Sequence, residues 1–120
     1  MFEVENYVIH VSRATKGVIT FDIPEYEFNV DDTIELRIYE KKGLDKLPVK
    51  TIEKTVKVAG PTIDIELTCE DTDIGEPANK EVEYWYEIEL NDEETVIGYD
   101  KDGPKKFILY PKGVEKDDKS

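Results

Sequence analysis

Residues 81–110 read EVEYWYEIELNDEETVIGYDKDGPKKFILY, and apolar and acidic side chains largely alternate through the first ten positions. A period of two is typical of a β-strand that buries one face and leaves the other in solvent. The predicted strand has a core row of Val82, Tyr84, Tyr86, Ile88 and Leu90 and a solvent row of Glu83, Trp85, Glu87 and Glu89.

The second half of the stretch predicts a β-hairpin. Two runs rich in β-branched and aromatic residues, 95–99 and 105–110, lie on either side of a segment that contains Asp102 and Gly103. Asp-Gly is a common signal for a tight turn between antiparallel strands. We therefore expect these two runs to pair with each other.

The same period of two recurs nearer the amino terminus, in residues 7–12, 18–23, 34–39 and 63–67. Residues 49–58 form another such run, in which Lys54 interrupts the apolar row and predicts a strand at the edge of a sheet. Gly, Pro, Asn and Asp gather between the runs, as chain reversals require. The pattern predicts an all-β fold, an antiparallel β-sandwich of about seven to eight strands. Its predicted core includes Phe21, Leu36, Ile38, Ile65, Tyr86 and Ile88.

The chain has 120 residues, enough to bury a core without a structural metal or a disulfide. We expect a single β-sandwich domain over residues 1–112, followed by a flexible acidic and polar tail over 113–120 that has no apolar row to bury. Within the domain, Thr68 and Asp71 have the spacing of a capping box, which predicts one helical turn at that point.

The charge balance argues against two classes of partner. The sequence holds 29 acidic and 16 basic residues, for a formal net charge of −13. Because phosphate groups are neutralised by clustered lysines and arginines, we expect no nucleic acid and no membrane among the partners. The opening residues lack the apolar core of a signal peptide, and no run approaches the 18 apolar residues of a membrane span. We therefore expect a chain that stays in the cytoplasm or is assembled from it.

Candidate catalytic residues are few. His10 is the single histidine, and Ser12 would lie on the same strand face roughly 7 Å away, too far for a nucleophile–base hydrogen bond. Cys69 is interpreted as a small buried filler at a turn. Asp100 and Asp102 imitate the start of a calcium loop, but the later ligands of such a loop are missing. The sequence predicts no catalytic, cofactor-binding or metal site, and a chain that is not an enzyme.

Trp85 is the exception in its row, an aromatic residue among carboxylates. A tryptophan on a solvent face leaves a large apolar surface wet unless something covers it. The cover could be a tyrosine or a lysine stem of an adjacent strand, or another protein chain. If another protein chain covers Trp85, the interaction surface consists of Trp85, Glu83, Glu87 and Tyr110. A third alternative is a carbohydrate-binding module that uses exposed aromatics as a stacking platform.

Several motifs resemble one known family. They are Asp32-Thr33 before an alternating strand, the turn LTCEDT over residues 67–72, and the strand YWYEIEL over residues 84–90. This order resembles the immunoglobulin-like β-sandwich at the amino terminus of phage baseplate upper proteins, and small prophage-encoded virion proteins built from it. Cys69 stands where that family has proline and Glu87 where it has aspartate. Residues 13–17, RATKG, replace the family's Arg-Gly-Asp-like opening.

The resemblance implies an immunoglobulin-like β-sandwich that serves as a non-enzymatic phage or prophage structural protein, in a baseplate, a tail or another part of the virion. Its implied partners are other virion structural proteins or further copies of itself. The implied location is the virion, assembled in the bacterial cytoplasm.

Overall fold

The computed structural model describes residues 1–42 and 47–112, so the predicted tail lies outside the described residues. The described part of the chain holds nine β-strands and no helix, which confirms the all-β prediction. The strands are β1 (Phe2–Glu5), β2 (Val8–Ser12), β3 (Gly17–Asp22), β4 (Thr33–Tyr39), β5 (Lys50–Thr55), β6 (Thr62–Leu67), β7 (Val82–Leu90), β8 (Glu94–Ile97) and β9 (Lys105–Tyr110).

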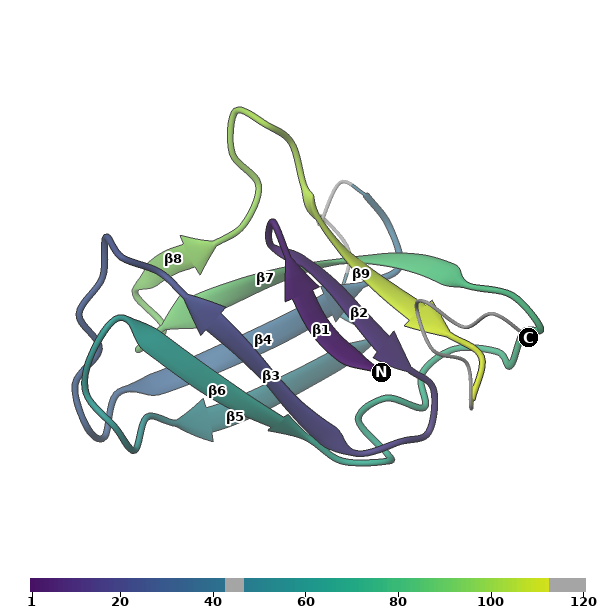
Figure 1. The fold of residues 1–120 in the computed structure, drawn as a ribbon. Helices are drawn as coiled ribbons and strands as arrows, with labels where there is room; N and C mark the ends of the chain where they lie inside the picture. The colour runs from purple at the N-terminus through teal and green to yellow at the C-terminus, as the bar shows by residue number, and fades with distance from the viewer. Residues whose placement is uncertain (43–46, 113–120) are drawn as a thin grey trace.

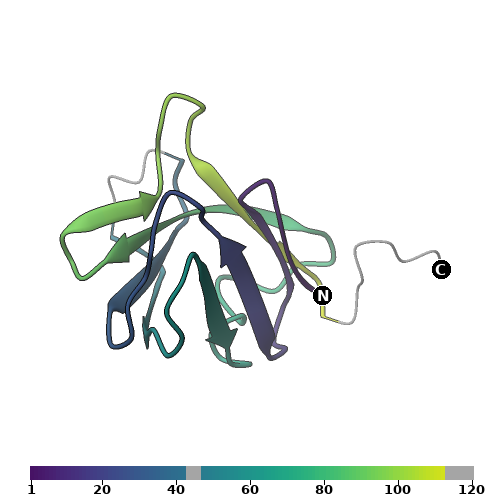
Figure 2. The same cartoon turned by 60° about the vertical axis from the view of Figure 1, so that its left-hand side comes forward.

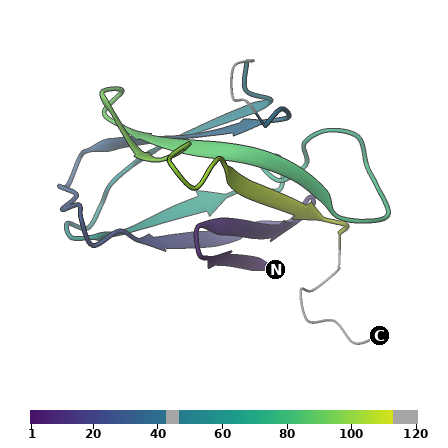
Figure 3. The same cartoon turned by 90° about the horizontal axis from the view of Figure 1, so that it is seen from above.

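The strands form two sheets (Figure 1). Seven of them make one sheet in the order β1-β2-β9-β7-β4-β5, with β8 also paired to β7, while β3 and β6 form a separate pair. Seen from above, the large sheet curls so that β1 and β2 reach the layer of β3 and β6 (Figure 3). The arrangement is therefore a half-barrel whose open side is covered by the β3–β6 pair.

One strand pair departs from the antiparallel prediction. β2 runs parallel to β9, with Ile9 opposite Phe107 and Val11 opposite Leu109. The large sheet is therefore mixed, and the expectation of a purely antiparallel sandwich is wrong. The alternation of side chains is the same in parallel and antiparallel strands, so the sequence period does not carry the direction of pairing.

The predicted pairing of residues 95–99 with 105–110 is also wrong. β8 and β9 both pair with β7, β8 with its carboxyl-terminal end and β9 with its amino-terminal end. The tight turn lies instead between β7 and β8, where Asn91 and Asp92 have φ values of 51° and 57°. Two successive residues with positive φ match the twist of a β-hairpin, and Asn and Asp tolerate that conformation. The nine residues of β7 offer enough edge for two shorter strands in line.

The hairpin of β1 and β2 was not predicted from the sequence. Asn6 and Tyr7 form its turn, with φ values of 52° and 63°. A bulky residue such as tyrosine is rare in this conformation. A hydrogen bond holds the turn in place, because the Tyr86 hydroxyl donates to the Tyr7 carbonyl oxygen at 2.6 Å.

The core lies between the large sheet and the β3–β6 pair. All six core residues predicted from the sequence are at most 1% exposed. The rings of Phe21 and Tyr86 meet there from opposite layers, with centroids 6.1 Å apart. Burial raises the pKa of Tyr86 well above its ordinary value, so its hydroxyl stays protonated and remains a donor. Lys54 lies on β5, which ends the large sheet, and this confirms the predicted edge.

The predicted capping box is present. The Thr68 N–H donates to Asp71 Oδ2 at 2.9 Å, and the Asp71 N–H donates to Thr68 Oγ1 at 3.1 Å. The segment forms a turn and does not extend into a helix. Lys50 reaches the same carboxylate from β5, with 3.4 Å between Lys50 Nζ and Asp71 Oδ1. The box therefore ties this turn to the edge of the large sheet.

Asp71→Ala is expected to lower the free energy of unfolding at pH 7 by about 1 kcal/mol. Burial alone would raise the pKa of Asp71, but the hydrogen bonds from Thr68 and the charge of Lys50 outweigh it, and the pKa is lowered. A lowered pKa stabilises the fold above the unfolded-state pKa near 4, and this contribution is lost as the pH falls through the folded-state pKa. Urea unfolding at pH 7 and pH 2.5 should show the difference between variant and wild type shrinking in acid. Glu70→Ala, at the exposed neighbouring position, should match the wild type at both pH values.

Candidate functional site

The outer face of the large sheet carries a row of aromatic and apolar side chains. Register places Tyr39 of β4 opposite Trp85 of β7, and His10 of β2 opposite Ile108 of β9. Tyr110 lies two residues beyond Ile108 on the same face. We call these five residues the Trp85 strip; Tyr39, His10 and Ile108 are buried within it, and Trp85 and Tyr110 are half-buried. They lie on the face opposite the core row, away from the β3–β6 layer.

Trp85 is half-buried, and β4 and β9 flank it. On the β9 side its cross-strand neighbour is Lys106, whose Nζ lies 3.0 Å from Glu83 Oε2. A lysine in this position can lay its aliphatic stem along an indole ring while its charge stays in solvent. Trp85 and Glu83 therefore lie on one face of β7, and part of the tryptophan remains accessible.

Glu87 belongs to a cluster of charges beside the strip. It accepts hydrogen bonds from the Tyr39 hydroxyl at 2.8 Å and from Arg37 Nη1 at 3.3 Å. Burial, and then the bond to Glu87, raise the pKa of Tyr39 to about 12. The cluster thus fixes the side chain of Tyr39 and leaves Glu87 as a partly buried acceptor at the border of the strip.

Arg37 is the centre of that cluster. Its guanidinium pairs with Glu35, and Arg37 Nη1 lies 2.5 Å from Glu89 Oε1. Burial would lower the pKa of Arg37, but the hydrogen bond to Glu35 and the charge of Glu89 outweigh it and raise the pKa. Among the described residues, Glu35, Glu89 and Asp92 are spaced closely enough to hold a cation. Arg37 already supplies positive charge to two of these three carboxylates.

His10 and Ser12, the two residues considered for catalysis, each contact another side chain or the amino terminus. The Tyr110 hydroxyl lies 2.8 Å from His10 Nδ1, and their rings are 5.8 Å apart. The amino group of Met1 donates to Ser12 Oγ at 3.2 Å. His10 and Tyr110 are therefore in contact within the strip.

Cys69 and Asp100 are both exposed. Cys69 is exposed, so its interpretation as a buried filler is wrong. It lies in the middle of the capped turn. Asp100 accepts hydrogen bonds from Lys105 Nζ at 2.8 Å and from the Asp102 N–H at 2.9 Å. The hydrogen bond from Lys105, and then the one from the Asp102 N–H, lower the pKa of Asp100. Asp100 therefore stabilises the turn before β9.

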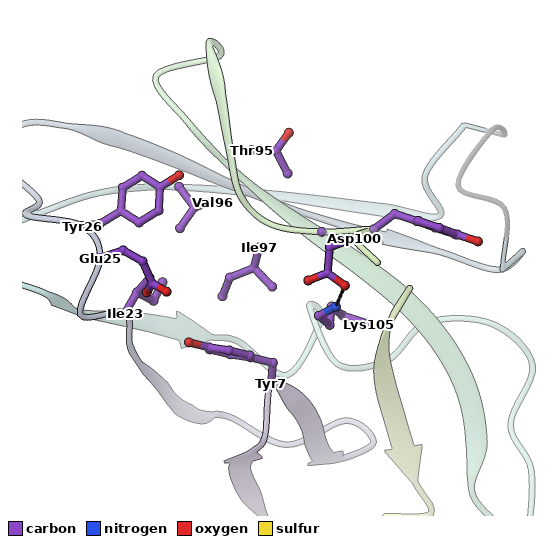
Figure 4. A pocket seen from close by; sticks show the side chains of 11 residues that line it. Tyr7, Ile23, Glu25, Tyr26, Thr95, Val96, Ile97, Asp100 and Lys105 are labelled. Atoms are coloured by element: carbon purple, nitrogen blue, oxygen red, sulfur yellow. Dashed lines mark hydrogen bonds and ion pairs between the residues drawn. The ribbon is translucent and has the colours of Figure 1, made fainter. Parts of the chain in front are cut away.

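A second candidate site, which sequence reasoning missed, is a hollow of about 340 Å³ between the first hairpin, the loop after β3, and β8 with the loop that follows it (Figure 4). Three tyrosines line it, Tyr7 from the first hairpin, Tyr26 from the loop after β3, and Tyr99 from the loop after β8. Tyr99 is 62% exposed. The segments that supply these rings are distant in the chain, so no local motif could have indicated the hollow. Tyr7, one of the three tyrosines, has a backbone conformation that is rare for a bulky residue.

Polar groups are interleaved with these rings. Glu25 lies beside Tyr26 on one wall, and the Lys105–Asp100 ion pair lies on the other (Figure 4). Tyr26 stacks on Phe28 with 5.8 Å between ring centroids, which fixes its orientation. Burial, and then a hydrogen bond with Glu94, raise the pKa of Tyr26. The hollow thus combines aromatic faces with carboxylate acceptors, a composition that suits polar ring-shaped ligands.

No known protein family, no curated protein and no solved structure matches this chain. Among the described residues, no helix has the length and apolar character to cross a membrane.

Proposed function

We propose that this chain is a non-enzymatic docking module that binds another protein through the Trp85 strip. The observation that carries the proposal is Trp85 itself, half-buried on an outer sheet face and bordered by Glu83 and Glu87. Aromatic residues are enriched at protein interfaces, where burying one tryptophan contributes about 2 to 3 kcal/mol. The surrounding carboxylates favour a partner with basic groups at the rim of the contact.

We further propose that the module is immunoglobulin-like and is a structural component of a phage or prophage virion. The strand order β9-β7-β4-β5, opposite the pair β3-β6, supports this fold, because it parallels the G-F-C-C′ and B-E strands of a variable-type domain. A hydrogen bond joins the RATKG and LTCEDT segments, in which the Thr15 N–H donates to Thr72 Oγ1 at 2.9 Å.

The virion role can be tested by sedimentation. The bacterium that carries the coding sequence is treated with mitomycin C, and released particles are separated on a density gradient. We expect an antibody against the chain to detect it in the particle band after nuclease and salt washes. Detection only in the soluble fractions at the top of the gradient would contradict a structural role in the virion.

The second candidate function is carbohydrate binding, favoured by the hollow with its three tyrosines. A sugar ring would stack on Tyr99, while its hydroxyls would donate to Glu25. We expect a panel of neutral mono- and disaccharides to shift the backbone amide signals of Val96 and Gly98 in NMR titrations. Tyr99→Ala should abolish these shifts, and Trp85→Ala should leave them unchanged. If no sugar produces a saturable shift, the hollow is not a carbohydrate site.

A further inference from the structure

The large sheet and the β3–β6 pair meet along one border and, among the described residues, are not joined along the other. Along the first border, β1 packs against β3 so closely that a Cβ on Gly17 would lie within 2.7 Å of three ring atoms of Phe2. Along the second border, β5 and β6 end the two sheets and run near each other (Figures 1 and 2). No ladder joins β5 to β6 in the described part of the chain. We call this second border the β5–β6 seam.

Both borders of the seam present backbone groups that pair with no other strand. The paired groups lie on the far side of each strand. Next to β5, the Val56 N–H donates to the Asp32 carbonyl oxygen of the β4 side at 2.8 Å, and next to β6, the Ile23 N–H of the β3 side donates to the Pro61 carbonyl oxygen at 2.8 Å. Alternate residues of a strand direct their N–H and C=O groups to opposite sides, so these two bonds fix which residues face the seam. They are Thr51, Glu53 and Thr55 on β5 and Thr62, Asp64 and Glu66 on β6. None of the six has a backbone hydrogen bond across the seam within residues 1–42 and 47–112.

The floor of the seam is apolar. A hollow of about 370 Å³ lies between the two strands, and the buried side chains of Ile34, Val56 and Ile63 line it. Val18 and Val58 stand at its rim, and Val58 is 76% exposed. A groove with an apolar floor and two unpaired sheet edges matches the recognition of an extended strand, whose backbone pairs with an edge while alternate side chains enter pockets.

The charged residues around the seam indicate which side chains an incoming strand should carry. Lys54 lies in the inward row of β5 between Ile52 and Val56, lines the hollow, and forms no ion pair with any described residue. It therefore favours an acidic side chain on the inward row of an incoming strand. Asp64 and Glu66 are exposed on the outward row of β6 and favour basic side chains there.

A second copy of this chain fits the seam poorly. Pairing β5 with the β6 edge of another copy would bring Glu53 near Asp64 and Glu66, and each copy carries a net charge of −13. An inward lysine is also a known device that keeps a sheet edge from pairing with its own kind.

We propose that the β5–β6 seam binds an extended segment of another protein by β-strand addition. The segment has an acidic residue between two apolar residues on its inward row and basic residues on its outward row. The seam shares no residue with the Trp85 strip, so this is a second docking site and does not depend on the first.

Synthetic peptides test the proposal on the full chain. The probe is acetyl-Thr-Val-Lys-Glu-Lys-Val-Thr amide, whose inward row is Val, Glu and Val. Two companions carry Val or Lys in place of the central Glu. In ¹⁵N NMR titrations we expect the Glu peptide to bind with a Kd below about 1 mM. Its saturable shifts should centre on residues 51–55 and 62–66. The Val peptide should bind more weakly, and the Lys peptide about tenfold more weakly than the Glu peptide.

Two controls separate the backbone from the charge. A Glu peptide that is N-methylated on alternate residues keeps its side chains but cannot form a ladder, and should lose binding at least about tenfold. Lys54→Glu should reverse the order of the Glu and Lys peptides, while Lys101→Glu, the same charge change in the loop before β9, should leave it intact.

Three outcomes would overturn the proposal. They are the absence of saturable shifts for all three peptides, shifts confined to residues outside the seam, and equal affinity of the N-methylated peptide. If dilution of the chain alone moves the seam signals, and sedimentation shows a dimer, the occupant is a second copy and the proposed partner is wrong.

Discussion

Arg13→Met is expected to lower the free energy of unfolding by about 3 kcal/mol. Arg13 is buried after β2, and its guanidinium binds the segment after the capped turn. Arg13 Nη1 donates to the Ile74 carbonyl oxygen at 2.6 Å, and Nη2 donates to the Glu76 carbonyl oxygen at 3.1 Å. Asp73 adds an ion pair at 3.5 Å from Nη1. Methionine fills a similar volume but donates no hydrogen bond, so these carbonyl groups would lose their donor.

Urea unfolding followed by far-ultraviolet circular dichroism measures this loss, with an unchanged m-value expected because the fold is the same. Lys16→Met, three residues along at an exposed position, removes one charge as well and should change the free energy of unfolding by less than about 0.5 kcal/mol. A loss below about 1 kcal/mol for Arg13→Met would mean that residues 74–76 are held without the guanidinium.

Phe107→Ala is expected to cost about 3 to 5 kcal/mol, a large part of the stability of a small domain. Phe107 is fully buried on β9, and its strand neighbours are Ile9 on the parallel side and Tyr84 on the antiparallel side. Truncation would open a cavity where the two directions of pairing meet. Phe107→Leu keeps most of the volume and should cost less than about 1.5 kcal/mol.

The same urea titration measures both substitutions. Equal losses for Phe107→Ala and Phe107→Leu would contradict the packing of this ring between β2 and β7, because the penalty should follow the volume removed.

The sequence predicts which face of each strand is buried, but it does not predict which strands pair with each other. The phase of each strand follows from which side chains must be buried, so the six residues predicted for the core of the sandwich, among them Phe21 and Tyr86, are buried. Val82 and Leu90, at the two ends of the predicted core row of β7, are half-buried. The partner of a strand depends on contacts across the whole chain. That is why the parallel pairing of β2 with β9 and the shared edge of β7 were not predicted. Trp85 could be recognised from the sequence because it is an aromatic residue in a row of glutamates on the solvent face of β7.

Sites assembled from several loops leave no such local trace. Tyr7, Tyr26 and Tyr99 each fit a local role in a turn or core, and only the fold brings them to one hollow. Lys54 is an intermediate case. Its place in an apolar row indicated a sheet edge, but the chain alone could not show that the edge of β6 faces it across the β5–β6 seam.

Docking through the Trp85 strip is tested most directly by Trp85→Ala, measured for both stability and association. Trp85 is half-buried, and its cross-strand neighbours are Tyr39 and Lys106. We expect the melting temperature of the variant to fall by no more than about 4 °C. In the density gradient the variant should leave the particle band, while Tyr99→Ala behaves as wild type. A fall of ten degrees or more in the melting temperature, or a variant that still bands with the particles, would contradict the account.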